Sequence, residues 1–347
     1  MAQIDQLFKK LIEQKGSDLH LQEGRKPQAR VHGHLADLTQ DILTQSTLNT
    51  LLSEILPAQQ WNHFQGHGDI DFAYSLGDQA RFRANYFRHF HGLGAVFRLI
   101  PSQIRTFEEL NLPPKIKDFA KFRNGLVFVT GPTGSGKSTT LAAIIDYINT
   151  NFNYKIITLE EPLEFVHQNK KSIICHREVG RDTASFAAGL RTAIKSDANV
   201  ILVGELRDRE TMELALNASE MGILVFATLH TNCAAKTVDR IIDSFPSNRK
   251  NQIRTILANN LSAIVAQQLL QDKTGGRRWG AYEILVRTSA ISNLILMGEV
   301  GKLHNEIQVS KSVGMIQMDD YLMELVNSGK VTKEAAFLKA IDKNRFV

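Results

Sequence analysis

One nine-residue stretch constrains the fold more than any other part of this chain: Gly131-Pro132-Thr133-Gly134-Ser135-Gly136-Lys137-Ser138-Thr139. It fits the pattern G-x-x-x-x-G-K-[ST], in which glycines let backbone N–H groups curl around phosphate oxygens. An apolar run at 126–130 precedes it and predicts a buried strand, and residues 141–148 follow it as a predicted helix. Strand, glycine loop and helix in this order predict a phosphate-binding loop at a helix N-terminus.

The nine residues are therefore our candidates for nucleotide binding. We expect the Lys137 ammonium to reach the β- and γ-phosphates of ATP, and the Ser138 hydroxyl to ligate Mg²⁺.

The composition sets outer limits on the function. A chain of 347 residues with 43% hydrophobic residues predicts two domains, each with a real core. The formal charge of +5 is mildly basic, and an ordinary surface explains it better than nucleic-acid binding. Two cysteines outside any C-x-x-C pattern fit a reducing cytoplasm and exclude a four-cysteine zinc site.

Neither a membrane span nor a signal sequence is expected. No run of 18 apolar residues occurs, and the N-terminus lacks an apolar signal core. The N-terminus instead predicts an amphipathic helix, with a face made of Ile4, Leu7, Phe8, Leu11 and Ile12.

The pattern predicts an α/β fold in two parts. Alternating strands at 69–76, 81–86 and 95–100 belong to a small first module. The sequence Leu112-Pro113-Pro114 is the best linker signal, because consecutive prolines disfavour helix. We therefore place the domains at 1–112 and 113–347, with a helical C-terminal region from about 288.

The second domain alternates strands and helices. Strands are predicted at 155–159, 199–203 and 223–228, and helices at 208–220 and at 183–195, the latter capped by Asp182 or Thr183. Repeated βα units predict a parallel sheet with ligand sites at the carboxyl ends of its strands.

Acidic residues stand at two of these strand ends. Glu205 follows the apolar run at 200–203, where a carboxylate can hold Mg²⁺ through water, although Gly204 occupies the position that is usually aspartate. Glu160, Glu161 and Glu164 follow the strand at 155–159, and one of them could orient the attacking water. The alternatives are a surface glutamate and a solvated acidic loop.

Other polar candidates lie at a third strand end and in the first domain. His230 follows Thr228 and could sense a γ-phosphate, the alternative being a structural histidine. Arg81 and Arg83 share one face of their strand, and Arg98 lies on the next strand. Such arginines can act on a nucleotide across a subunit boundary, and the alternative is a solvated hairpin face.

Together these motifs resemble the PilT family of type IV pilus retraction motors, within the secretion ATPases. The resemblance spans nearly the whole chain. Residues 17–21 resemble the family's N-terminal motif, 81–85 its arginine strand, 131–139 its Walker A, 159–167 its Asp box, 200–208 its Walker B with the glycine normal there, and 227–232 with 234–237 its His box.

The resemblance implies a homohexamer of subunits with a PAS-like N-terminal domain and a RecA-like P-loop ATPase domain, with ATP at the subunit interfaces. It implies that Glu164 is the catalytic carboxylate, Glu205 the Walker B acid and His230 the His-box histidine, with Arg81, Arg83 and Arg98 reaching across the interface. It implies a cytoplasmic motor at the inner membrane, driving retraction through a membrane platform protein, with a paralogous retraction ATPase as a further candidate partner and no nucleic acid.

Four departures keep other functions open. Glu161 stands where the family has aspartate, Ile223 where relatives carry histidine, and Ser292 where the usual motif has arginine, and residues 314–319 also differ from the usual pattern. The alternatives are a PilU-like accessory motor or a related pilus assembly or secretion ATPase. From other classes, a nucleic-acid translocase and a non-enzymatic nucleotide-binding scaffold are also considered.

Overall fold

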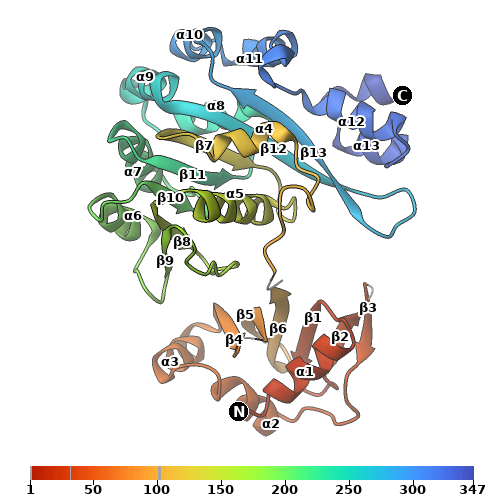
Figure 1. Cartoon of the computed structure of the whole chain (residues 1–347). Helices are drawn as coiled ribbons and strands as arrows, with labels where there is room; N and C mark the ends of the chain where they lie inside the picture. The colour runs from red at the N-terminus through yellow and green to blue at the C-terminus, as the bar shows by residue number, and fades with distance from the viewer. Residues whose placement is uncertain (1, 32, 78, 101–102) are drawn as a thin grey trace. The chain divides into compact units, whose positions relative to one another are not determined.

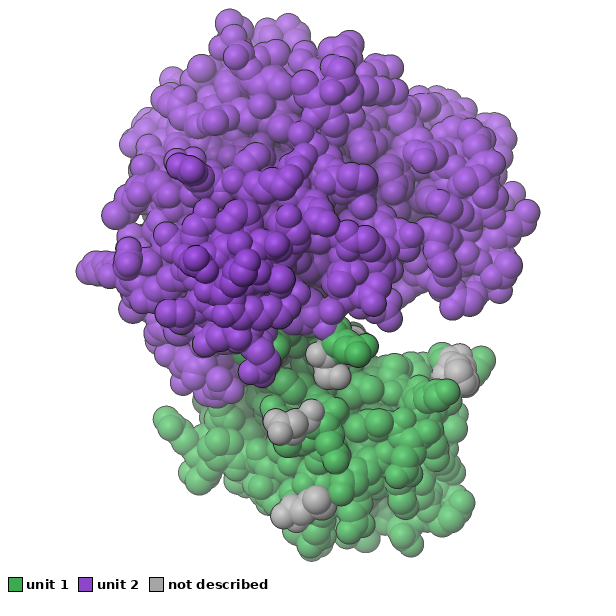
Figure 2. Space-filling view, in the orientation of Figure 1, with its two compact units in different colours: residues 1–103, 161–166 green, residues 104–160, 167–347 purple. Residues whose placement is uncertain are grey.

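A computed structural model describes residues 2–31, 33–77, 79–100 and 103–347 of the chain. Contacts divide the chain into two compact units (Figure 2). The first contains residues 1–103 and 161–166, and the second contains residues 104–160 and 167–347. The sequence places the start of the second domain at residue 113, beyond the break at 103/104.

The first unit is an antiparallel sheet with helices (Figure 1). Its strand order is β3-β2-β1-β6-β5-β4. The strands are β1 Asp18–Gln22, β2 Gln28–Val31, β3 His34–Asp37, β4 Asp69–Leu76, β5 Ala80–His89 and β6 Gly92–Ile100, and the helices are α1 Asp5–Glu13, α2 Gln45–Ser53 and α3 Ala58–His67.

The predicted amphipathic helix is confirmed as α1, and it forms part of the core of the first unit. Phe8 is fully buried and stacks on Phe82 of β5, with ring centroids 4.2 Å apart. Ile4 and Leu11 are also buried. The three predicted strands correspond to β4, β5 and β6, while β1, β2 and β3 escaped the sequence analysis.

The second unit is built on a seven-stranded sheet in the order β13-β12-β7-β11-β10-β8-β9. All neighbouring strands are parallel except β12 and β13, which form an antiparallel hairpin. The strands are β7 Gly125–Thr130, β8 Lys155–Glu160, β9 Ile173–Glu178, β10 Val200–Val203, β11 Leu224–Leu229, β12 Leu261–Gln271 and β13 Arg278–Val286. The predicted α/β class with a parallel sheet is confirmed.

Helices cover both faces of this sheet (Figure 1). Alternate strand residues such as Phe128 and Val225 pack with α6, α7, α8 and α9, whereas Val127 and Phe226 pack with α4 and α5. The helices are α4 Pro114–Phe119, α5 Lys137–Asn151, α6 Phe186–Ile194, α7 Arg209–Glu220, α8 Ala234–Asp243 and α9 Lys250–Asn260. Burial on both faces explains why the strands read as continuous apolar runs.

The C-terminal region is helical, as predicted, and comprises α10 Ser289–Met297, α11 Leu303–Val309, α12 Met318–Asn327 and α13 Lys333–Lys339. Two of the predicted glycine breaks, Gly298 and Gly314, have φ of 74° and 88°, which side chains other than glycine rarely adopt. Across the described ranges, no helix combines the length and apolarity needed to span a bilayer.

Two local predictions are wrong. The prolines at 113 and 114 begin a helix, with Pro113 as N-cap and Pro114 in the first turn, where a missing N–H costs nothing. Helix α6 begins at Phe186 instead of residue 183, because the Ser185 hydroxyl accepts from Ala188 N at 3.1 Å. Asp182 instead accepts a hydrogen bond from the Glu178 N–H at 2.9 Å.

Candidate functional site

Four neighbouring strands bring the predicted motifs to one edge of the sheet. Strands β7, β11, β10 and β8 are consecutive in the sheet order. Their registers align the carboxyl ends, with Leu229 opposite Thr130, and Val203 opposite both Ala227 and Leu159. The carboxyl ends of these strands share one edge of the sheet, which is where parallel sheets bind ligands. At this edge lie the glycine loop, Glu205, His230 and Glu160.

The loop between β7 and α5 has the backbone of a phosphate cradle. Gly131, Gly134 and Gly136 have φ of 146°, 78° and 89°, a region that side chains rarely adopt. Helix α5 begins at Lys137, and none of the side chains that the structure describes caps its N-terminus at Gly136. Its first N–H groups and the helix dipole therefore favour an anion at this position.

Polar atoms of the loop fit a phosphate ligand. Lys137 Nζ donates to the carbonyls of Gly131 at 2.8 Å and Pro132 at 3.1 Å, so the ammonium lies over the loop. In the described part of the chain, the buried hydroxyls of Thr130 and Ser135 have no hydrogen-bond partner. Phosphate oxygens are natural acceptors for such donors.

The end of β10 explains why Gly204 precedes the acid. Gly204 N–H donates to the Leu159 carbonyl at 2.7 Å. An ideal Cβ at residue 204 would lie 3.2 Å from that carbonyl oxygen and 3.3 Å from Glu160 Cα. Any side chain at this position would require the neighbouring strand to shift by a few tenths of an ångström, which disfavours the aspartate that is usual there.

Glu205 is the centre of a small charged cluster. His230 Nε2 lies 3.0 Å from Glu205 Oε1, and Arg207 Nε lies 3.0 Å from Glu205 Oε2. The Glu205 side chain is 23% exposed. Thr228 Oγ1 donates to the Gly204 carbonyl and ties β11 to the same strand end. Sequence reasoning proposed Glu205 and His230 separately and missed both their contact and Arg207.

The segment 161–166, which contains Glu164, groups with the first unit. The Glu161–Pro162 peptide bond is cis, and Glu164 is half-buried. The chain directly after this segment is held to the second unit. His167 N–H donates to His176 Nε2 at 3.0 Å, and Asn149 Nδ2 donates to the Gln168 carbonyl at 2.8 Å.

The three candidate arginines lie on β5 and β6 of the first unit. Arg81 and Arg83 alternate with buried Phe82 and Ala84, so they share the outer face of β5 as predicted. Arg83 is exposed and lies directly opposite Arg98. Arg98 Nε donates to Asp18 Oδ1 at 2.8 Å.

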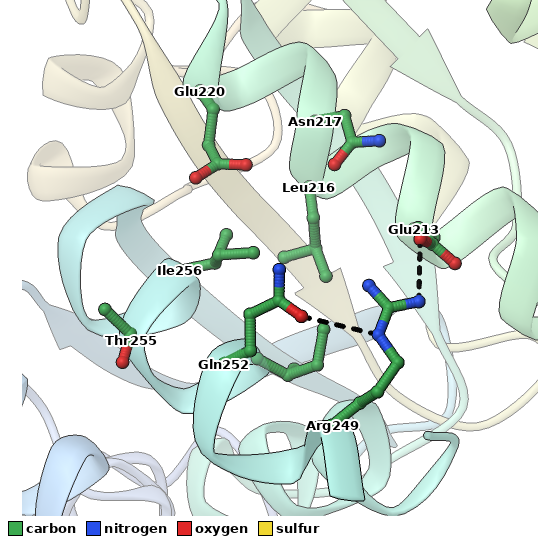
Figure 3. Close-up of a pocket in the computed structure, with 9 residues that line it drawn as sticks. Glu213, Leu216, Asn217, Glu220, Arg249, Gln252, Thr255 and Ile256 are labelled. Atoms are coloured by element: carbon green, nitrogen blue, oxygen red, sulfur yellow. Dashed lines mark hydrogen bonds and ion pairs between the residues drawn. The ribbon is translucent and has the colours of Figure 1, made fainter. Parts of the chain in front are cut away.

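A separate cavity of about 320 Å³ lies between α7 and α9 (Figure 3). Glu213 and Arg249 point toward one another over it, with 2.9 Å between Oε1 and Nη1. Gln252 also contacts Arg249, and Leu216, Ile253 and Ile256 form its apolar part. The glycine loop, Glu205, Arg207 and His230 together form what we call the strand-end cluster. None of the residues that line the cavity belongs to this cluster, so we do not assign the nucleotide site to the cavity.

The fold and the strand-end cluster together define a class: an N-terminal α/β domain followed by a doubly wound domain with a phosphate-loop backbone. Comparison with known proteins narrows this class. The model of the family described as "Type II/IV secretion system protein" matches residues 1–313, and the chain belongs to this family.

Individual relatives confirm the resemblance to the PilT family. The chain is 44% identical to the "Type IV pilus retractation ATPase PilT" of Pseudomonas aeruginosa, over 97% of this chain and 98% of that protein. It is 37% identical to the "Type IV pilus ATPase PilU" of the same organism, over 99% of this chain and 90% of that protein. A crystal structure described as the pilus retraction motor PilT with bound ADP superposes with a TM-score of 0.92 at 40% identity, covering 99% of each chain.

Proposed function

We propose that this protein is an ATP-hydrolysing motor that powers retraction of type IV pili, and thereby twitching motility. The observation that carries the proposal is the match to PilT over nearly the whole of both chains. The glycine loop, Glu205 and His230 at one edge of the sheet support it. The match to a structure described with bound ADP supports nucleotide binding at the glycine loop.

The residues divide the work of hydrolysis between them. The backbone N–H groups of residues 131–139 and the Lys137 ammonium bind the phosphates and offset their charge. The Glu164 carboxylate orients the attacking water and accepts its proton. Ion pairs with His230 and Arg207 fix the orientation of the Glu205 carboxylate at the end of β10.

Magnesium suits the oxygen donors at this edge. Ser138 supplies a hydroxyl and Glu205 a carboxylate, and Mg²⁺ prefers one or two protein oxygens with the rest of its ligands from phosphates and water. When bound, the ion neutralises phosphate charge and fixes phosphate orientation. In the described residues no three His, Cys, Asp or Glu side chains gather into a metal site, which fits an ion held mainly by its substrate.

Two variants separate binding from hydrolysis. Lys137→Ala should weaken ADP binding, because it removes the cation that offsets phosphate charge. Glu164→Gln should retain binding and lose about 10²–10⁴-fold in ATPase rate, because an amide cannot accept the proton. A wild-type ATPase rate for Glu164→Gln would reject its assignment, and Glu160 and Glu161 would then be tested.

We also propose that the protein is a homohexamer in which Arg81 and Arg83 of one subunit reach the nucleotide of the next. Subunits carrying both arginine→Ala changes would be mixed with Glu164→Gln subunits after dissociation. Some interfaces would then combine intact halves, so ATPase activity should reappear with the hexamer peak on a sizing column. If mixed hexamers stay inactive at every ratio, the arginines either act on the nucleotide of their own subunit or take no part in hydrolysis.

The second candidate is a PilU-like accessory motor. The 37% identity to PilU over 99% of the chain favours keeping it, as does Ser292 of α10, which stands where the usual motif of the family has arginine. Ser292 Oγ instead donates to the Ala258 carbonyl at 2.7 Å. Deleting the encoding gene distinguishes these functions. Excess pili with lost twitching would support a retraction motor, and retained twitching would support an accessory motor. Cells without pili would indicate a motor for pilus assembly.

An inner-membrane platform protein is the partner on which such a motor would act, and it would hold the protein at the membrane. Co-purification of the platform protein's cytoplasmic domain with the full-length chain tests this. Loss of co-purification in a Lys137→Ala hexamer that still assembles would make the contact dependent on nucleotide, whereas no binding to the wild type would contradict the proposal.

A further inference from the structure

The β12–β13 hairpin places a buried amide beside the phosphate loop. Strand β12 pairs with β7 in parallel, and Ala266 lies opposite Thr130, the last residue of β7. Gln267 is therefore level with the first residue of the loop. The residue is only 3% exposed, and its side chain lies on the opposite face of β12 from that of its neighbour Gln268.

Both ends of this amide bond the loop and the helix that follows it. Gln267 Nε2 donates to the Ser135 carbonyl at 2.8 Å. Gln267 Oε1 accepts from Thr140 Oγ1 in the first turn of α5, also at 2.8 Å. A donor is needed on one side and an acceptor on the other, and the uncharged amide of glutamine supplies both without any change of protonation.

The same residue accounts for two of the loop glycines. An ideal Cβ on Gly131 would lie 2.2 Å from the Gln267 carbonyl oxygen, and one on Gly136 would lie 2.9 Å from Gln267 Nε2. The loop is thus pressed directly against β12. Strand β12, as well as any bound phosphate, excludes side chains at these two positions.

The bond to Ser135 has a consequence for the ligand side of the loop. In a trans peptide, the carbonyl of one residue and the N–H of the next point in opposite directions. Holding the Ser135 carbonyl on Gln267 therefore turns the Gly136 N–H away from β12. That N–H lies at the start of α5, where the helix N-terminus favours an anion.

We propose that Gln267 is a positioning residue that sets the phosphate loop in its binding conformation. The proposal rests on the proposed function, because it concerns nucleotide binding at that loop. It assigns to the strand hairpin a role that the glycine-lysine motif alone does not indicate. Gln267 touches no reacting atom and acts only through Ser135, Thr140 and the two glycines.

The test compares adjacent glutamines. Gln267→Met keeps the volume and removes both bonds, and Gln267→Glu keeps the acceptor but sets a carboxylate against the Ser135 carbonyl. Gln268→Met is the matched control, since Gln268 is 5% exposed and its amide donates to the Lys339 carbonyl at 3.0 Å in the C-terminal helices. Each full-length variant is measured for thermal midpoint, for methylanthraniloyl-ADP Kd, and for KM and kcat with ATP.

We expect both Gln267 variants to raise the ADP Kd and the ATP KM about tenfold, and to change kcat by less than KM. Gln268→Met should lower the thermal midpoint as much and leave Kd and KM unchanged. Thr140→Val should raise Kd in the same direction, and it should add little to Gln267→Met because both remove one shared bond.

Three results would overturn the proposal: a wild-type Kd in Gln267→Met, an equal rise of Kd in Gln268→Met, or full additivity of Thr140→Val with Gln267→Met. If Gln267→Met does not fold, Thr140→Val decides instead, because a wild-type Kd in that variant would reject the role of the bond to α5. A wild-type protein that fails to bind the ADP probe would reject the proposed function itself, which distinguishes that failure from the failure of the Gln267 assignment.

Discussion

Replacing Gly204 by alanine should destabilise the second unit and slow ATP hydrolysis without weakening nucleotide binding. The added Cβ would lie 3.2 Å from the Leu159 carbonyl oxygen and 3.3 Å from Glu160 Cα. Both are backbone atoms of β8, an internal strand of the sheet, and the 2.7 Å bond from Gly204 N–H to the Leu159 carbonyl prevents β8 and β10 from separating freely. The neighbours must move by a few tenths of an ångström.

The magnitude follows from two opposed effects. Overpacking of this kind costs about 1–3 kcal/mol. The lower entropy of an alanine in the unfolded chain offsets about 0.4–1 kcal/mol, since the Gly204 backbone lies outside the positive-φ range. The net loss should be about 1–2 kcal/mol, which lowers the thermal midpoint of a domain of this size by about 2–8 °C.

Thermal unfolding, steady-state ATPase rates and ADP titration measure these effects. Because Glu205 follows directly, a displaced strand end should lower kcat several-fold and leave the ADP Kd unchanged. Gly301→Ala is the matched control, because no atom of the described residues lies within 4 Å of its added Cβ and its φ lies outside the positive range that favours glycine. It should be neutral or slightly stabilising. A Gly204→Ala protein as stable and as active as wild type would refute the packing explanation for this glycine.

Three further predictions concern single side chains. Glu205→Gln should retain ADP and lose most ATPase activity, because it removes the carboxylate that faces His230 and Arg207. Ile223→His should destabilise the protein by about 1–3 kcal/mol and leave binding intact, because Ile223 is 7% exposed in the apolar core at the amino end of β11. Burial lowers the pKa of His167 to about 4 from its usual 6.5, so the unfolded chain takes up a proton at higher pH than the folded one. Stability should therefore fall by about 2 kcal/mol between pH 7 and pH 5, and His167→Phe should flatten that slope in urea titrations.

Each of these has a clear contrary outcome. A fully active Glu205→Gln protein would remove Glu205 from the reaction. An Ile223→His protein of unchanged stability but altered ADP affinity would connect the amino end of β11 to the site. An unchanged pH slope in His167→Phe would mean that another group takes up the proton.

The motifs that follow apolar strands could be predicted from the sequence because each depends on local pattern alone. The strand at 126–130, the glycine loop and the helix after it are all encoded within about 25 residues, and β7 and α5 confirm them. Parallel βα units then require their carboxyl ends to share an edge, which brings Glu205 toward His230. The 3.0 Å contact between them depends on side-chain geometry that no pattern specifies.

Features that depend on contacts between distant parts of the chain could not be predicted from the sequence. Gln267 lies 132 residues from the Ser135 carbonyl that it binds, and its hairpin carries the same apolar residues as any core segment. The reason for Gly204 lies in the approach of β8, which neither strand encodes by itself. Pro114 was misread because a proline pair disfavours a helix that precedes it but favours one that starts at it.

The sequence does not distinguish the three candidate arginines, but their contacts differ in the structure. Arg83 and Arg98 lie directly opposite on β5 and β6, an arrangement of like charges that destabilises a sheet. Asp18, directly opposite Arg98 on β1, offsets this repulsion. Burial alone would raise the pKa of Asp18, but hydrogen bonds from Ser17 and Arg98 hold it below its ordinary value.

Arg98 therefore has a task inside its own subunit. Removing it would leave the Asp18 carboxylate, 7% exposed, without its cation, and the fold of the first unit would lose stability before any nucleotide contact was tested. The bond to Asp18 also offsets the positive charge of Arg98, so that Arg98 repels the opposite Arg83 less strongly. Of the pair on β5 and β6, exposed Arg83 is the better candidate for reaching an adjacent subunit, and for this reason the mixed-hexamer experiment uses the β5 arginines and leaves Arg98 in place.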